Sequence, residues 1–148
     1  MKRDSRLSAV LHALLHMAEQ DRAMTSGELA VCMDTNPVVV RRTMAGLREA
    51  GFVTSDRGHG GGWRLACDLD AVSLKDIYDA LGAAPVLSIG VHVEHPECLV
   101  EQAVNRALEG AFHEAEALLL ERFADVTLKR LVDDYRRRVK PAHNGKRS

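Results

Sequence analysis

The chain has 148 residues, enough for one domain that buries a core without disulfide bonds. Its 46% hydrophobic and 28% charged residues exclude a wholly disordered chain or a fibrous repeat, and its three scattered cysteines exclude a disulfide scaffold. There is no apolar run of about 18 residues and no secretory pattern, so we expect a cytoplasmic protein without a membrane partner.

Charge is divided unevenly along the chain, although the net charge is only −1. Residues 1–66 carry nine Lys and Arg against seven Asp and Glu, whereas residues 67–135 carry five against fourteen. Residues 136–148 carry six basic residues and no acidic one. Only the first segment and the tail are therefore suited to bind a polyanion.

The start of the chain predicts two helices. Thr25 and Glu28 have the spacing of a capping box, so a short helix should follow through Met33. An earlier helix is predicted over residues 7–19, where apolar side chains recur at helical spacing at Leu7, Val10, Leu11, Leu14, Leu15 and Ala18.

A third helix is predicted from Pro37 to about Ala50. Asn36 is a good N-cap, and proline suits the first helical position because its missing N–H would have no partner there. Gly51 stands at the usual stop position. The inward-facing residues would be Val40, Met44 and Leu47.

Two short strands are predicted next, at residues 52–55 and 63–66, joined by a polar, glycine-rich loop over residues 56–62. Ser73 then caps a helix through Leu81, and residues 83–97 are irregular. The expected divisions are a winged helix-turn-helix domain at 1–82, a linker at 83–97, dimerisation helices at 98–135 and a basic flexible tail at 136–148.

The order of these elements is that of a winged helix-turn-helix, so we expect a mainly α fold with a small β-hairpin wing and a long C-terminal dimerisation helix. The third helix would enter the major groove of DNA, and the wing would approach the phosphate backbone or the minor groove. The residues expected to bind DNA are Asn36, Val38, Arg41, Arg42 and Arg48 on the helix, and Ser55, Arg57, Gly58, His59 and Gly60 on the wing.

Each half of this interface also has a simpler interpretation. The arginines could belong to an ordinary solvated helix face, and the glycines at 60–62 could form only a hairpin turn. A nucleotide-binding phosphate loop is disfavoured, because these glycines precede a strand rather than a helix and the Lys-Ser/Thr ending is missing.

Three stretches resemble the Rrf2 (IscR/NsrR/CymR) family of bacterial regulators: residues 28–30, 47–53 and 55–66. The most specific is the string Ser-x-Arg-Gly-x-x-Gly-Gly-aromatic-x-Leu that begins at Ser55, and the resemblance extends over about residues 1–135. It implies a homodimeric winged-helix transcription factor, usually a repressor. It also implies that the long C-terminal helix pairs across the dimer and that the wing arginine touches the minor groove.

The long helix itself favours a dimer. Its stripe of alanine and leucine allows close helix–helix approach, although the helix could also fold back on its own domain. A two-fold dimer predicts a double-stranded, pseudo-palindromic operator with half-sites about one helical turn apart, or a multiple of it.

Many members of the resembled family hold an iron–sulfur cluster on three closely spaced cysteines before the long helix, and this chain departs from that pattern. Only Cys98 remains in that region, so we expect no cofactor. An alternative metal or cluster site could use non-standard ligands, namely His92, His95 and Cys98 with His12 and His16. These histidines could equally be ordinary exposed side chains.

A cysteine thiol is the other group through which the protein could sense a signal. Cys32 lies at the end of the helix before the recognition helix, so its oxidation could alter the placement of that helix, with Cys98 as a second candidate. Cys32 could instead be a small buried hydrophobe. A protein-interaction module without DNA binding is the alternative function, and no arrangement of nucleophile and base suggests an enzyme.

Overall fold

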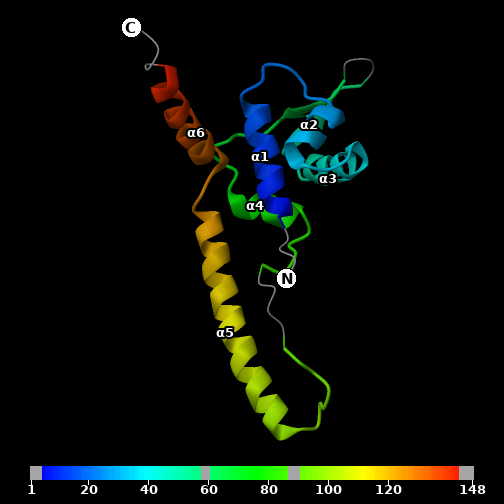
Figure 1. Cartoon of the computed structure of the whole chain (residues 1–148), viewed down its shortest axis with the longest axis vertical. Helices are drawn as coiled ribbons and strands as arrows, with labels where there is room; N and C mark the ends of the chain where they lie inside the picture. The colour runs from blue at the N-terminus through cyan, green and yellow to red at the C-terminus, as the bar shows by residue number, and fades with distance from the viewer. Residues whose placement is uncertain (1–4, 58–60, 87–90, 144–148) are drawn as a thin grey trace.

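The computed structural model describes residues 5–57, 61–86 and 91–143 (Figure 1). Within these residues the chain is mainly helical, with one two-stranded antiparallel sheet, which confirms the predicted fold class. Even the longest described helix lacks the apolar stretch that crossing a bilayer requires. The elements in order are α1 (Arg6–Ala18), α2 (Ser26–Met33), α3 (Pro37–Glu49), β1 (Val53–Ser55), β2 (Trp63–Leu65), α4 (Leu74–Ala80), α5 (Leu99–Ala124) and α6 (Leu128–His143).

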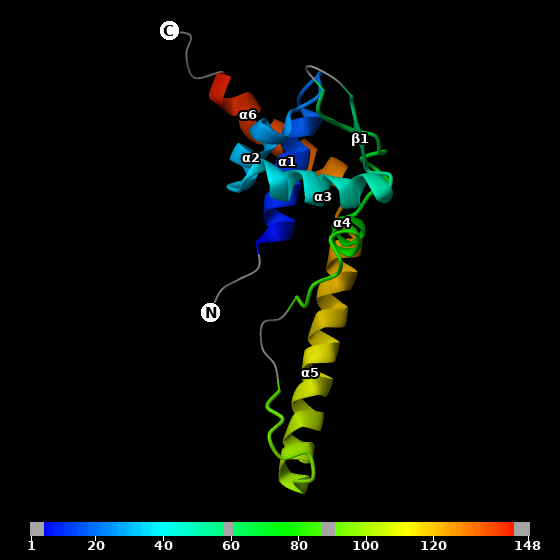
Figure 2. The same cartoon turned by 90° about the vertical axis from the view of Figure 1, so that its right-hand side faces the viewer.

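The first four helices and the hairpin form one body, from which α5 extends as a long arm (Figures 1 and 2). The core of this body takes side chains from α1, α2, α3, β1, β2, α4 and α6. Leu14, Leu29, Met44, Leu47, Ile77 and Leu128 are the largest of its fully buried side chains. The predicted inward positions of α3 are all buried, whereas in α1 the buried residues are Val10, Ala13, Leu14 and Met17.

The α1 stripe was therefore only partly predicted correctly. Val10 and Leu14 are buried, but Leu15 and Ala18 are half-buried, and Ala13 and Met17 take the inward positions instead. The inward face is set by the elements that α1 packs against, which are α2, β2 and α6. Apolar spacing alone does not reveal these neighbours.

Local signals position α2 and α3 as predicted. Thr25 and Glu28 form both hydrogen bonds of the capping box at the start of α2. At the end of α3, Gly51 has a φ of 86° and its N–H donates to the Arg48 carbonyl, while the Phe52 N–H donates to the Leu47 carbonyl. This is a Schellman motif, and it turns the chain from α3 directly into the hairpin.

The hairpin is anchored on the body by a third, single-residue pairing that was not predicted. Met24 and Trp63 exchange backbone hydrogen bonds of 3.0 and 2.8 Å, and the Trp63 indole N–H donates to the Ser26 hydroxyl. The Gly62 backbone lies so close to this pairing that an added Cβ would be 2.4 Å from the Met24 carbonyl oxygen. Position 62 therefore requires glycine for close packing, not only for a flexible loop.

Helix α5 packs on the body only at its C-terminal end. Its Phe123 ring meets Tyr78 of α4 edge-on, with ring centroids 6.3 Å apart. None of the 26 residues of α5, all within the described part, is buried. The residues of the predicted alanine and leucine stripe are exposed in the single chain, with Leu118 at 56%.

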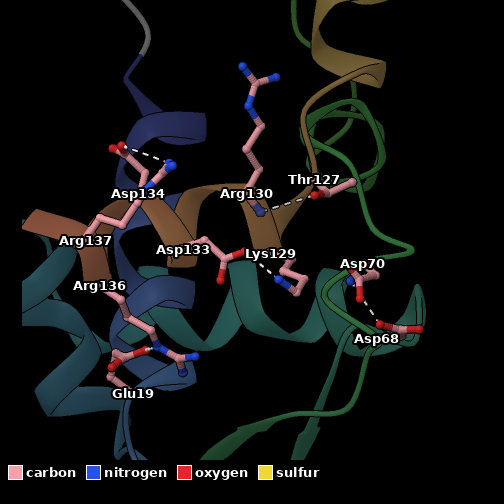
Figure 3. A network of polar contacts seen from close by, with 10 residues as sticks. All are labelled: Glu19, Asp68, Asp70, Thr127, Lys129, Arg130, Asp133, Asp134, Arg136 and Arg137. Atoms are coloured by element: carbon pink, nitrogen blue, oxygen red, sulfur yellow. Dashed lines mark hydrogen bonds and ion pairs between the residues drawn. The ribbon is translucent and has the colours of Figure 1, made fainter.

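Helix α6 is longer than predicted. It continues to His143, so the prediction that a flexible tail begins at position 136 is wrong for residues 136–143. Ion pairs one turn apart stabilise this polar segment, between Lys129 and Asp133 and between Asp134 and Arg138. Arg136 also forms a 3.0 Å ion pair with Glu19 at the end of α1 (Figure 3).

Candidate nucleic-acid interface

The outward face of α3 is open and basic. A helix turns about 100° per residue, so with Val40, Met44 and Leu47 buried, the opposite side carries Val38 and Arg42, with Arg41 at its edge. Both arginines are exposed, and neither side chain has a hydrogen bond or ion pair within the part of the chain that the structure describes. Their guanidinium groups are available to an outside anion or to a base edge.

The outward face of α3 is bordered by α4 on one side and by the hairpin on the other. Gly46 lies against α4, where an added Cβ would be 3.5 Å from the Ala80 carbonyl oxygen. Arg48 turns toward the hairpin, where its Nη1 donates to the Ser55 hydroxyl at 3.2 Å and its guanidinium lies 5.7 Å from the centre of the Trp63 ring. Arg48 and Ser55 were both predicted to bind DNA, and in this structure they bind each other.

Asn36 has a structural role at the start of α3. Its Oδ1 accepts hydrogen bonds from the Val38 and Val39 backbone N–H groups, at 3.0 and 3.1 Å, which confirms the predicted N-cap. An asparagine that recognises adenine needs both its oxygen and its amide NH₂. Because the oxygen is occupied, only the Asn36 NH₂ group is left to face a ligand.

The wing carries a third exposed arginine whose side chain has no partner among the described residues. Arg57 lies two residues after the end of β1, is exposed, and has no ion pair to any residue that the structure describes. Its neighbour Asp56 pairs with Arg64 at 2.9 Å across the hairpin, so the nearby acidic charge is largely matched. The predicted wing residues Gly58, His59 and Gly60 lie outside the described residues.

Helix α3 and the hairpin are neighbours on one side of the body. Figure 2 shows α3 running across the body with β1 beside its C-terminal end. The contacts that join them come from Arg48, Ser55 and Trp63. Sequence analysis identified the exposed arginines but missed the structural use of Trp63, which only a long-range contact could reveal.

The cysteines lie on separate elements. Cys32 is half-buried and packs against the core from α2, and Cys98 is exposed at the start of α5. Cys67 is half-buried just after β2, where burial, with the nearby Asp68 carboxylate, raises the pKa of its thiol. A raised pKa reduces the thiolate fraction, so Cys67 is a poor nucleophile.

The histidine candidates form two separate groups. On α1, the His12 and His16 Nε2 atoms lie 2.9 Å apart. Before α5, His92 pairs with Glu94 at 3.4 Å, and the His95 backbone N–H donates to the Glu101 carboxylate. Among the described residues there is no group of three or more His, Cys, Asp or Glu side chains placed to hold a metal ion.

Known proteins are similar to this chain in sequence and in fold. The family described as iron-dependent transcriptional regulator, Rrf2, matches residues 3–134. YwnA of Bacillus subtilis (strain 168), whose name places it among the HTH-type transcriptional regulators, is 30% identical over 126 residues, which are 85% of this chain and 93% of YwnA.

Two solved structures support the fold alone, since both are under 25% identical. A protein from Lactobacillus plantarum has a TM-score of 0.73 at 24% identity, covering 89% of this chain and 90% of its own. IscR of T. potens has a TM-score of 0.66 at 18% identity, covering 91% of this chain and 88% of its own.

Proposed function

Because this chain belongs to the Rrf2 family of transcriptional regulators, we propose that it binds a pseudo-palindromic operator as a homodimer and represses transcription. The family and YwnA are regulators rather than enzymes, which agrees with the DNA-binding function expected from the sequence. The protein would act in the bacterial cytoplasm, where the DNA is.

The observation that carries the DNA-binding part is the set of uncompensated cations on one side of the body. Arg41 and Arg42 are exposed on α3 without partners in the described chain, and Arg57 is exposed at the adjoining wing. Cations whose charge is not matched within the protein release counterions when they meet phosphates, and this release drives DNA binding. In the proposed complex α3 enters the major groove and Arg57 contacts the flanking backbone or minor groove.

Two variants test these separate roles of α3 and Arg57, with DNA binding measured by fluorescence anisotropy on labelled duplexes. Replacing Arg57 by alanine should weaken binding to every sequence and lower the slope of log affinity against log salt by about one unit. Replacing Arg41 by alanine should reduce discrimination at one base pair of the operator. Arg130→Ala removes an exposed arginine of α6 and serves as the matched control.

The proposal fails if neither wild-type protein nor variants bind any duplex more tightly at low salt than at high salt. Equal losses for Arg41→Ala and Arg57→Ala on operator and random DNA would contradict their separate roles. A loss in the Arg130→Ala control as large as that for Arg57→Ala would show that binding follows overall charge.

Helix α5 supports the homodimer. Its apolar side chains are exposed in the single chain, with Val100 at 72%, Val104 at 51% and Leu108 at 41%. At 100° per residue these residues share one side of α5 with the small residues Ala107, Ala111 and Ala115. A helix that carries such a stripe and leaves it exposed in its own chain is expected to bury it against a second copy.

Sedimentation velocity tests the pairing. Wild-type protein should sediment as a dimer of about twice the chain mass, and Ala111→Arg should shift it to monomer because a charged side chain would then stand in a close helix–helix contact. Glu109→Arg places the same charge on the opposite side of α5, about 180° from Val100, and should leave the dimer intact. A wild-type monomer at micromolar concentration would refute the proposed dimer.

The proposal also includes control of operator binding by oxidation of the Cys32 thiol. Cys32 packs at the edge of the core in α2, and the backbone of this helix leads through residues 34–36 into α3. Oxidation of a half-buried thiol adds polar volume that the core edge must accommodate, which would shift α2 relative to α3. Peroxide should therefore weaken operator binding by wild-type protein and by Cys98→Ser, but not by Cys32→Ser.

The iron dependence in the family description does not transfer to this single chain. The residues do not fit an iron–sulfur cluster, because Cys32, Cys67 and Cys98 lie on separate elements and no set of three ligands gathers in the described residues. The metal content and visible spectrum of protein purified without oxygen test this mismatch. A stoichiometric iron signal would contradict it.

A further inference from the structure

The outward face of α3 begins with an apolar side chain rather than a polar one. Val38 is 57% exposed in the first turn of the helix, one turn before Arg42 on the same side. Exposed valine is a poor choice for a surface that meets only water. At the end of the helix that enters the groove first, this side chain is placed to contact an apolar group of a bound duplex.

The major groove offers one such group. Each base pair there presents hydrogen-bond donors and acceptors, and only thymine adds a methyl group, at C5. A valine isopropyl group cannot donate or accept a hydrogen bond, so it distinguishes thymine from the other bases through apolar contact. The neighbouring arginines recognise a different feature, since a guanidinium binds guanine O6 and N7.

The Val38 side chain is also held in a defined place. Its backbone N–H donates to Asn36 Oδ1 at 3.0 Å, and Pro37 fixes the backbone just before it. A β-branched side chain in a helix has essentially one preferred χ1 rotamer, so little freedom remains to be lost on contact. Val38 thus presents a rigid apolar side chain on the outward face of α3.

We propose that Val38 reads a thymine methyl group in each operator half-site. The thymine would lie within about two base pairs of a guanine bound by Arg42, because four helical residues span about 6 Å and base pairs stack about 3.4 Å apart. This inference rests on the proposed function and adds to it a specificity-determining residue and the base that it recognises.

Substitution of deoxyuridine for thymidine tests the proposal, because it removes only the C5 methyl group. The probe is the duplex that wild-type protein selects from a randomised pool, with each thymine of both half-sites replaced in turn. At one symmetry-related position, loss of the methyl group should weaken wild-type binding about fourfold for each half-site. The Val38→Ala protein should bind the thymine and uracil duplexes at that position with equal affinity.

Val139→Ala is the matched control, because it removes the same two methyl groups from an exposed valine of α6. This variant should keep the full uracil penalty, and circular dichroism should show unchanged helix content for both variants.

The proposal is overturned if uracil is tolerated at every position by wild-type protein, or if Val38→Ala keeps the wild-type penalty. The first of these tests needs no variant, so it remains valid even if Val38→Ala folds poorly. Failure to select any duplex would instead overturn the proposed function, and this inference with it.

Discussion

The guanidinium carbon of Arg48 lies 5.7 Å from the centre of the Trp63 ring, which joins the last turn of the recognition helix to the second strand of the hairpin. The same guanidinium donates to the Ser55 hydroxyl of the first strand at 3.2 Å. A cation over an aromatic face and a hydrogen bond to the neighbouring strand together fix the angle between helix and wing. The arrangement of the two parts that we propose to contact DNA is thereby set inside the protein.

Replacing Arg48 by alanine should therefore have two effects. Loss of the ring contact and hydrogen bond should reduce the free energy of unfolding by about 1 kcal/mol, because both contacts are near the surface. Operator affinity should also fall, because the wing would no longer be held at a fixed angle to α3. Urea denaturation and anisotropy measure the two quantities separately.

Arg41→Ala is the control for this pair, because Arg41 is exposed and has no partner in the described chain. Its unfolding free energy should stay within about 0.5 kcal/mol of wild type. Equal stability of Arg48→Ala and wild-type protein would show that the contact with Trp63 does not hold the wing.

Gly62→Ala should strongly destabilise the protein. The new Cβ would lie 2.4 Å from the Met24 carbonyl oxygen, and since that oxygen belongs to backbone, the hairpin must move and lose its pairing with Met24. The expected cost is on the order of 2–3 kcal/mol in the free energy of unfolding, measured by urea denaturation.

Gly27→Ala makes the same chemical change where space is available. A Cβ at Gly27 would lie at an ordinary contact distance of 3.8 Å from Thr25 Oγ1, and alanine favours the helix that contains it. This control should be as stable as wild-type protein or slightly more stable. If Gly62→Ala were as stable as Gly27→Ala, the close packing of the hairpin on residue 24 would be refuted.

Stability should fall in acid through Glu28. The Arg22 guanidinium, with the backbone N–H of Thr25, lowers the pKa of the Glu28 carboxyl from 4.5 to about 2. A carboxyl whose pKa is lower in the folded state contributes stability above pH 4.5 and loses that contribution as the pH falls toward 2. Glu28→Gln lacks this titration, so its melting temperature should approach that of wild type over this interval.

Thermal melts from pH 7 down to pH 2.5 measure this difference. Arg22→Gln removes the largest cause of the pKa shift of Glu28. The fall in melting temperature toward low pH should therefore also be smaller in this variant. If plots of melting temperature against pH for wild type and Glu28→Gln stay parallel across the whole range, the role of the carboxylate is contradicted.

Local patterns predicted most of the recognition unit. The capping box at Thr25, the N-cap at Asn36 and the stop at Gly51 depend on neighbouring residues, and each appears in the structure as the sequence predicted. The burial of Val40 and Met44 follows from helical spacing once the helix is placed.

Features that depend on distant residues could not be predicted in this way. Arg48 was assigned to DNA because it is an exposed arginine on α3, but its partner Trp63 lies fifteen positions later and is brought close only by the hairpin. The length of α6 was missed for a related reason. A polar run predicts fraying, whereas Arg136 pairs with Glu19, which lies 117 positions earlier at the end of α1.

The lack of any buried residue in α5 has a consequence for the cell. If two copies must pair before an operator is filled, the amount of active regulator rises with roughly the square of the free chain at low abundance. A modest change in gene dosage or protein turnover would then move the promoter across a threshold rather than along a gentle slope.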